Sequence, residues 1–401
     1  ARPPPPRPRG APLTDRRILT RPFVLVVLST AVLFFGFYFL IPVLPPYAAA
    51  RGASKGEVGL VVGLASMTAL ATRAAFARAL DRKGRRPFAL GGLALFAAAT
   101  ALLPLAASLV PLLLVRGVQG IGWGLATTAI ASLVADLAPA ERRGEAIGVW
   151  GLAPTVAMAL GPAAGGALSR LGGPATAFLG TALLFLLALG LLLPVAEPSH
   201  AAGQTRTASL PAGALLPCAV LFLSSLSYGA ILAFVPVELG PGKTGTYFLL
   251  YAVSILAVRP FAGRLSDRYG RVAVAVPGLL LGAAGVVGTG LARGPLSLAA
   301  AAVLYGVGMA GLSFPALVAW TVDLAGEARG TAMAAFYGAY DLAIALGAFA
   351  LGALYERHGF AALNLAGAAG VVAASLLAVA FSGAARRRRP DLGNPGPRRA
   401  C

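Results

Sequence analysis

Long apolar runs separated by short polar breaks occur along the whole chain. A helix needs about 20 mostly apolar residues to cross a bilayer. Counted in this way, the pattern predicts an all-α integral membrane protein with twelve transmembrane helices, six in each half of the chain. The predicted helices span residues 22–47, 56–77, 87–107, 110–135, 144–168 and 174–195 in the first half, and 213–239, 244–263, 272–292, 295–322, 330–354 and 361–383 in the second.

The second half repeats the first at an interval of 186 residues. Residues 77–86 read ARALDRKGRR, and residues 263–271 read GRLSDRYGR. The same interval relates four further pairs of identical residues: Arg73 and Arg259, Glu141 and Glu327, Gly144 and Gly330, and Gly161 and Gly347. The chain is an internal duplication, which predicts two pseudo-symmetric six-helix bundles.

The composition agrees with a protein that lives in lipid. Of the 401 residues, 58% are hydrophobic and 12% are charged, and the mean hydropathy is +0.81. These values exclude an ordinary soluble domain. The Pro- and Arg-rich start predicts a disordered tail. The expected order is a basic tail at 1–21, a bundle at 22–195, a polar linker at 196–212, a bundle at 213–383 and a basic tail at 384–401.

The net charge of +19 is concentrated in short loops and in the tails. A nucleic-acid surface would interleave such charges with aromatic residues, and these segments do not. If the N-terminus is cytoplasmic, 24 of the 33 Lys and Arg residues fall in inside segments and six in outside loops. This bias predicts that both termini face the cytoplasm, as in a multi-pass protein of the bacterial inner membrane.

The sequence offers no constellation for catalysis or for a cofactor. Cys218 lies inside an apolar run and Cys401 is the last residue, while His200 and His358 fall in predicted loops. Neither a disulfide framework nor a metal site is expected. The sequence has no nucleotide-binding loop of the GxxxxGKS type, so direct use of ATP is not expected. We therefore expect neither an enzyme nor a bound cofactor.

The repeated DR-x-G turns, at Asp81 and Asp267, resemble the signature loop of the major facilitator superfamily, in particular its twelve-helix, proton-coupled efflux branch. Two positions depart from the family pattern, because Ala77 replaces its first glycine and Val272 replaces its last basic residue. The resemblance implies a transporter whose two halves rock around a central site. It also implies a monomer whose partners are a small solute, protons and the lipid bilayer.

In this family the turn residues act as a gate on the cytoplasmic side. The resemblance implies that Asp81 sits at the positive end of the helix at 330–354, and Asp267 at that of the helix at 144–168, where the helix dipole favours an anion. The alternative is that the basic turns only anchor the topology. The expected gate residues are Asp81, Arg82, Gly84, Arg85, Arg73, Gly263, Asp267, Arg268, Gly270, Arg271 and Arg259, and the expected partners of the turn arginines are acids such as Asp136, Glu141, Asp323 and Glu327.

Residues 112–125, LLLVRGVQGIGWGL, resemble the fourth-helix motif of the family, in which an arginine faces the central cavity. An arginine inside a membrane is costly unless it faces protein or water. We expect Arg116 to take part in proton coupling. The alternatives are that its side chain snorkels to the surface or that it holds the first helix in place.

A GPxxGG stretch, formed by Gly161, Pro162, Gly165 and Gly166, resembles the core of the family's antiporter signature, with Ala157 in place of its leading glycine. Proline kinks a helix, and glycine lets a neighbouring helix pack closely. The resemblance favours export over import. The alternative is an ordinary packing seam of small residues.

Asp341 is the only acid that the pattern places near the middle of the membrane. A carboxyl group shielded from water can take up and release a proton near neutral pH, as a proton-coupled carrier requires. The alternative is a permanent ion pair with Arg73, because the family architecture places the two helices side by side. Both interpretations stay open at this point.

By resemblance, the first, fourth, seventh and tenth helices line the substrate cavity. The first helix carries no carboxylate, which favours a neutral, amphipathic or anionic solute over a purely cationic one. Each aromatic residue has packing as its alternative role. The expected cavity residues are Phe35, Tyr38, Trp123, Ser225, Tyr228, Tyr305, Met309 and Phe314.

Together these features predict a secondary active transporter that works by alternating access. We expect proton-coupled antiport that exports a small hydrophobic or amphipathic compound. A proton-coupled importer or a facilitator of a metabolite is the alternative within transport. A receptor or scaffold that does not transport is the alternative of another class, although the short predicted loops disfavour it.

Overall fold

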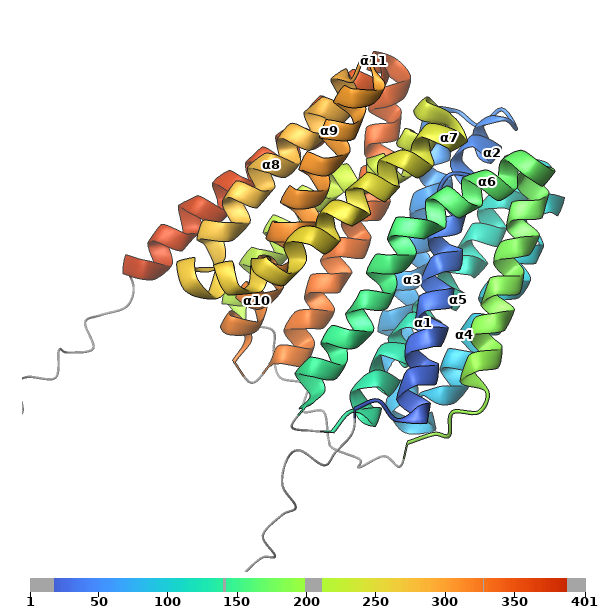
Figure 1. Ribbon diagram of the computed structural model, residues 1–401, viewed down its shortest axis with the longest axis horizontal. Coiled ribbons are helices and arrows are strands. Elements are labelled where there is room, and N and C mark those ends of the chain that lie inside the picture. Colours follow the sequence, from blue (N-terminus) through green and yellow to red (C-terminus); the bar gives the residue numbers. More distant parts are fainter. Residues whose placement is uncertain (1–17, 140–141, 199–210, 327, 388–401) are drawn as a thin grey trace, which may run out of the picture.

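The computed structural model describes residues 18–139, 142–198, 211–326 and 328–387, which are helical and contain no strand. Figure 1 shows their arrangement. The elements are α1 (Arg21–Leu40), α2 (Leu44–Ala49), α3 (Lys55–Lys83), α4 (Arg86–Ala101), α5 (Leu109–Leu137), α6 (Arg143–Leu192), α7 (Leu215–Tyr269), α8 (Arg271–Leu291), α9 (Pro295–Tyr305), a π-helix η5 (Gly306–Ser313), α10 (Phe314–Ala325) and α11 (Arg329–Arg387), with short 3-10 turns at Leu103–Leu105 and Ala212–Ala214.

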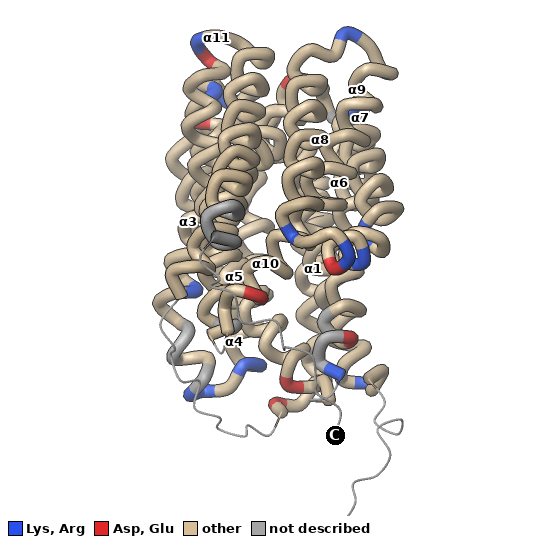
Figure 2. The backbone as a smooth tube through the Cα atoms, turned by 90° about the vertical axis from the view of Figure 1, so that its left-hand side faces the viewer, with Lys and Arg blue, Asp and Glu red and all other residues tan. Residues whose placement is uncertain are grey.

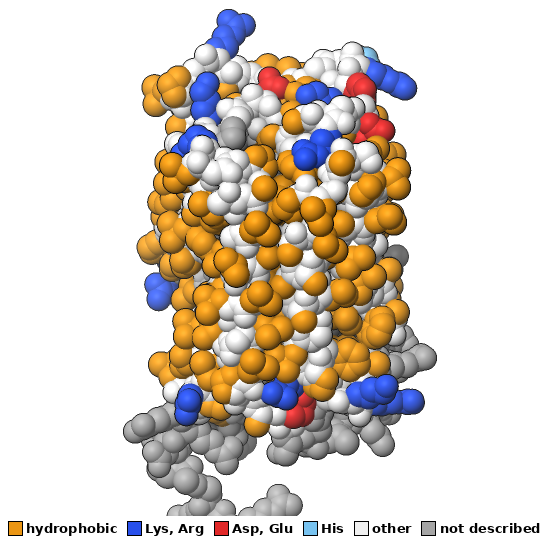
Figure 3. Space-filling model, turned by 90° about the vertical axis from the view of Figure 1, so that its right-hand side faces the viewer, with side chains coloured by type: hydrophobic (Ala, Val, Ile, Leu, Met, Phe, Trp, Pro, Cys, Tyr) orange, Lys and Arg blue, Asp and Glu red, His pale blue; other side chains and the backbone are white. Residues whose placement is uncertain are grey.

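Ten helical stretches within the described residues are long and apolar enough to cross a membrane. The helices run roughly side by side along the length of the molecule (Figure 2). A broad apolar belt covers the middle of the face in Figure 3, and most charged side chains gather near its two ends. This distribution is what a surface in contact with lipid requires.

Three predicted loops are replaced by a single glycine each. The loops expected at 169–173, 240–243 and 355–360 are helical except for Gly173, Gly240 and Gly359, whose φ angles are 79°, 72° and 82°. Only glycine adopts such angles without strain, so one residue redirects the chain where the apolar pattern suggested several. These loop predictions were therefore too long.

The DR-x-G motifs also differ from the loops expected there. α3 continues to Lys83 and α7 to Tyr269, and the turns themselves are Gly84, with φ 90°, and Gly270, with φ 98°. Gly263 lies inside α7 and has open space around it, so it is not a turn residue. The predicted helix at 22–47 is also interrupted, because α1 ends at Leu40 and α2 begins at Leu44, in a stretch that contains three prolines.

The helices form two groups, α1–α6 and α7–α11, that lean together at the upper end of Figure 1 and diverge at the lower end. We call the lower end, which carries the turns at Gly84 and Gly270, the basic end. The upper end, which carries Lys55 and Glu356, is the opposite end. There the N–H of Gly56 donates to the Glu356 carboxylate at 3.3 Å.

Small residues bring the two groups into backbone contact towards the opposite end. A Cβ atom added at Gly59 of α3 would lie 2.0 Å from the carbonyl oxygen of Ala348 in α11. One added at Gly245 of α7 would lie 2.9 Å from the Cα of Ala163 in α6. Such approaches are possible only where a side chain is missing. The structure is therefore closed at the opposite end.

Candidate functional site

An ion pair joins the two groups of helices near the middle of the molecule. Arg73 of α3 binds the carboxylate of Asp341 in α11, and its second terminal nitrogen donates to Thr127 Oγ1 at 3.1 Å. The Asp341 side chain is 14% exposed. The sequence left two interpretations open for Asp341, a proton carrier or an ion pair with Arg73. The structure shows the contact that the ion pair requires.

A matching contact without a second carboxylate lies between α6 and α7. Arg259 donates to Thr155 Oγ1 at 2.8 Å. The interval of 186 residues that relates Arg73 to Arg259 also relates Thr155 to Asp341. Each arginine thus contacts the helix of the other group at the equivalent position, but one partner is charged and the other is neutral.

Arg116 of α5 is buried, with 6% of its surface exposed. Its guanidinium donates to the carbonyl oxygens of Val61 at 2.7 Å and Val62 at 3.2 Å in α3, and to Gln119 Oε1 at 2.7 Å. Gln119 in turn donates to Thr100 Oγ1 at 2.7 Å. The side chain does not snorkel to the surface, and it holds α3 rather than the first helix.

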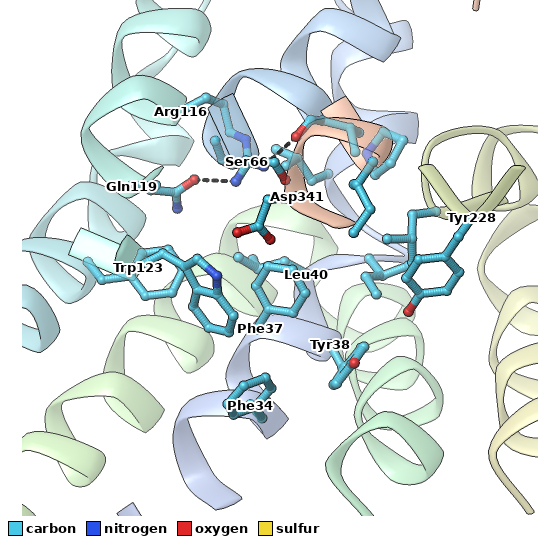
Figure 4. Close-up of a pocket in the computed structure, with 18 of the residues that line it drawn as sticks. Phe34, Phe37, Tyr38, Leu40, Ser66, Arg116, Gln119, Trp123, Tyr228 and Asp341 are labelled. Atoms are coloured by element: carbon cyan, nitrogen blue, oxygen red, sulfur yellow. Dashed lines mark hydrogen bonds between the residues drawn. The ribbon is translucent and has the colours of Figure 1, made fainter. Parts of the chain in front are cut away.

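A cavity lies between the two groups of helices and is lined by residues of α1, α2, α3, α4, α5, α7 and α11. Figure 4 shows Arg116, Gln119 and Trp123 on one side, Tyr228 on the other, and Asp341 between them. Its volume is about 140 Å³, which is enough for several water molecules at about 30 Å³ each. Five predicted residues therefore meet in one cavity: Tyr38, Arg116, Trp123, Tyr228 and Asp341.

The remaining predicted cavity residues lie elsewhere. A smaller cavity of about 30 Å³ within the second group shares Tyr228 with the first, and its lining includes Ser225, Tyr305, Met309 and Phe314. Phe35 lines neither cavity, and its ring lies 6.0 Å from that of Phe39 in an apolar cluster. A helix places residues 34, 37, 38 and 41 on one face and residues 35 and 39 on another, which explains why Phe35 lies outside both cavities.

The sequence analysis missed several residues that line the central cavity. The ring of Phe37 stacks on that of Trp123 with centroids 4.4 Å apart, and the ring of Phe34 meets Trp123 edge-on at 5.0 Å. The helical spacing of Phe34, Phe37 and Tyr38 was the signal that identifies their shared face. Gln119 had a signal too, as a polar residue one turn beyond Arg116. The residues missed are Phe34, Phe37, Ser66, Gln119 and Tyr340.

The turns at the basic end carry two of the ion pairs expected of them, and the other two expected partners, Glu141 and Glu327, lie outside the described residues. Arg85 binds Asp136 at the end of α5, and Arg271 binds Asp323 in α10 at 2.8 Å. In addition, the Glu197 carboxylate accepts from the backbone N–H groups of Arg85 at 2.8 Å and Arg86 at 2.7 Å. These contacts tie each turn to helices of its own group.

The contacts that the resemblance implied between the groups are not seen among the described residues. Asp267 binds Arg271 of its own turn, and its side chain is 70% exposed. Its predicted contact with the start of α6 therefore remains a prediction for another conformation. The Asp81 side chain lies outside the part of the chain that the structure describes. Arg82 is exposed, and the Arg268 guanidinium lies 5.4 Å from the Tyr269 ring centroid.

We expect the Arg271 and Asp323 pair to add little to stability. Asp323 is 51% exposed, and exposed ion pairs contribute roughly 0.2–1 kcal/mol. Arg271→Ala and Asp323→Ala, made singly and together, should therefore show a coupling free energy below about 1 kcal/mol in thermal unfolding of the purified protein. A much larger coupling would mean that the pair holds the fold together.

The GPxxGG stretch of α6 packs against α1. A Cβ atom at Gly161 would lie 2.7 Å from Tyr38 Cβ, and one at Gly165 would lie 2.1 Å from the carbonyl oxygen of Phe39. Pro162 lies inside the helix, and Gly166 is buried. Because Ala163 also faces Gly245 of α7, the stretch is in contact with both groups of helices. A movement of one group relative to the other would therefore change the contacts of this stretch.

The sequence model of the Major Facilitator Superfamily matches residues 26–237 and, in a second alignment, residues 217–400. The chain belongs to this superfamily. It is therefore a multi-pass membrane transporter, and members of the family are transporters rather than enzymes. Matches in both halves agree with the resemblance seen in the repeated turns.

Known members of the superfamily resemble the chain over different lengths. An uncharacterized transporter of Salmonella typhimurium, STM4428, is 30% identical over 311 residues, 71% of this chain and 77% of that protein. The inner membrane transport protein YajR of Escherichia coli is 36% identical over 132 residues, which cover 32% of this chain and 29% of YajR. The E. coli xylose transporter XylE, solved in a partially occluded inward open conformation, has a TM-score of 0.73 at 18% identity, with 90% of this chain and 98% of that one covered. This last likeness shows the fold.

Proposed function

We propose that this transporter is a proton-coupled antiporter that exports a small amphipathic compound by alternating access. The observation that carries the proposal is the ion pair between Asp341 and Arg73, which joins the two groups of helices beside the central cavity. Protonation of Asp341 removes its charge and releases Arg73. Proton binding is thereby linked to how the two groups meet.

We propose further that the chain crosses the membrane twelve times, in pseudo-symmetric bundles at 22–195 and 213–383 joined by the linker at 196–212. Two of the ten apolar stretches, 148–192 and 331–381, are 45 and 51 residues long. At about 1.5 Å per residue each is long enough for two crossings. Each also contains a glycine kink, at Gly173 and at Gly359 respectively. Counting these two stretches twice gives twelve.

The proposed orientation places the basic end in the cytoplasm, with both termini on that side of a bacterial inner membrane. The excess of Lys and Arg in the segments at this end supports it. In this orientation the structure is closed on the outside, and the contact proposed between Asp267 and the start of α6 forms when the basic end closes. The turn residues then act as a cytoplasmic gate.

The direction of transport rests on the GPxxGG stretch. Its glycines let α1 approach α6 closely at Tyr38, a cavity residue, so a change in this seam reaches the cavity wall.

A proton moving inward through about 100 mV releases about 2.3 kcal/mol, which sustains a roughly fiftyfold gradient of an exchanged solute. The second candidate is a facilitator, which a permanently closed Arg73–Asp341 pair would favour.

Proteoliposomes with a trapped pH dye test this function. We expect that a transported solute, added on one side in the absence of a pH gradient, moves protons in the opposite direction, and that an imposed pH gradient drives accumulation of that solute. Candidate solutes are added singly from a panel of aromatic acids, amines and neutral amides. Solute movement without any proton movement would contradict antiport and favour the facilitator.

A further inference from the structure

The central cavity holds a positive charge that no described carboxylate neutralises. Its lining contains two charged residues, Arg116 and Asp341. Asp341 is bound to Arg73. The three groups that accept hydrogen bonds from Arg116 are two backbone carbonyls and the amide oxygen of Gln119, and all three are neutral. With Arg73 and Asp341 cancelling each other, a net charge of about one unit remains on the Arg116 side.

Arg116 also has N–H donors that make no hydrogen bond to the described residues. A guanidinium carries five N–H donors in a planar fork and does not lose its proton in proteins. The described residues accept from three of them, so two N–H groups remain for a ligand. The Ser66 hydroxyl lines the same cavity, one turn along α3 from Val62, and has no hydrogen-bond partner among the described residues. It is a further donor on the same wall.

Most of the remaining lining of the cavity is apolar and consists of aromatic and aliphatic side chains. Phe34, Phe37 and Trp123 form one packed wall, and Tyr228 and Tyr340 stack with centroids 6.0 Å apart on another. Such walls take a planar apolar body and exclude water from the charged end of the cavity. An amphipathic ligand therefore meets apolar rings at one end and guanidinium donors at the other.

We propose that this cavity selects organic anions, with the carboxylate or an equivalent oxyanion of the solute on Arg116 and its aromatic body against the wall formed by Phe34, Phe37 and Trp123. This inference rests on the proposed function and names its substrate class. Arginine pairs with carboxylates through two parallel N–H donors, and the strength of that pairing grows in a desolvated site. A cation entering the same cavity meets an uncompensated guanidinium, while the carboxylate that would attract it is occupied by Arg73.

A matched set of three probes tests the charge preference on the intact protein. The probes are 1-naphthoate, 1-naphthamide and 1-naphthylmethylammonium, which share one ring system and differ in charge. Calorimetric titration of the purified full chain in detergent should give an affinity for naphthoate at least tenfold higher than for naphthamide, with the ammonium probe weakest. Equal affinities, tighter binding of the ammonium probe, or no binding of naphthoate would each overturn the proposal.

Variants then locate the anion. Arg116→Gln should remove the tenfold preference, Arg116→Lys should keep part of it, and Arg357→Gln, at an exposed arginine of the opposite end, should leave it unchanged. Loss of the preference in Arg259→Gln but not in Arg116→Gln would place the anion elsewhere and contradict the assignment. The wild-type comparison stands even if Arg116→Gln fails to fold.

The outcome is separable from that of the proposed function. Binding in detergent needs no proton gradient, so a naphthoate preference without proton antiport would refute the antiporter and leave the anion site intact. Proton exchange driven by amines alone would support the antiporter and refute the anion site.

Discussion

Asp341→Asn is expected to lower solute-driven proton movement in proteoliposomes at least tenfold while solute binding persists. Asparagine keeps the size and shape of the side chain but cannot release a proton at physiological pH. Because Asp341 is the one carboxylate in the cavity lining, its removal takes away the group that we propose to carry the proton. The measurement is the rate of change of the trapped dye after addition of a transported solute.

The control is Glu356→Gln, which removes a carboxylate at the opposite end but keeps a side-chain oxygen that can accept from the Gly56 N–H, so proton movement should stay near the wild-type rate. Asp341→Asn also leaves Arg73 without its counter-charge, which costs about 3–5 kcal/mol for a fully buried charge and less here because the Arg73 side chain is 24% exposed. The double variant Arg73→Gln with Asp341→Asn restores neutrality, so it keeps the test valid if the single variant does not fold. Full proton movement in either variant would exclude Asp341 as the coupling group.

The two equivalent arginines at the interface between the groups differ in the charge of their partners. Arg73 meets Asp341, whereas Arg259 meets Thr155 at the equivalent position. Of the two equivalent partners, only Asp341 carries a group that can bind and release a proton near physiological pH. The asymmetry is consistent with one proton site for each solute site.

Much of the fold follows from the sequence because its causes are local. The helices reflect runs of apolar residues, and the repeat at Asp81 and Asp267 identifies the family. The partners of Arg85 and Arg271 were also predictable, because Asp136 and Asp323 stand at the ends of helices that reach the same side of the bundle. The break predicted between residues 107 and 110 lies next to the observed start of α5 at Leu109, and the break predicted between residues 292 and 295 coincides with the gap between α8 and α9.

The remaining features depend on information that an apolar pattern does not contain. Gly173, Gly240 and Gly359 turn the chain through a positive φ angle, and nothing in hydropathy separates them from other glycines. Asp267 binds Arg271, four residues along the chain, whereas the resemblance implied a contact with the start of α6, and hydropathy does not distinguish between these two partners. Gln119 matters because it holds Arg116, a contact that the sequence suggests by spacing but does not orient.

Gly59→Val is expected to prevent closure at the opposite end and to reduce transport at least tenfold. A Cβ atom at this position would lie 2.0 Å from the backbone oxygen of Ala348, which a rotamer change cannot relieve. Forcing extra carbons into a packed contact costs about 1–3 kcal/mol, occasionally more. Because valine places three carbons against a backbone oxygen, the cost lies in the upper part of this range, and about 2–3 kcal/mol disfavours the closed state by about 30- to 150-fold. The conformational equilibrium should therefore shift towards a state that is open at the opposite end.

Thiol labelling measures the shift directly. A cysteine introduced at Ala65, in the cavity lining, is placed in a chain without Cys218 and Cys401, and an impermeant maleimide is added from the side of the opposite end. The reporter should react slowly in the parent and at least tenfold faster in Gly59→Val. Gly91→Val is the matched control, because Gly91 is a helical glycine with open space around it, and its labelling and transport should match the parent. Slow labelling and normal transport in Gly59→Val would show that the seam between α3 and α11 does not govern access to the cavity.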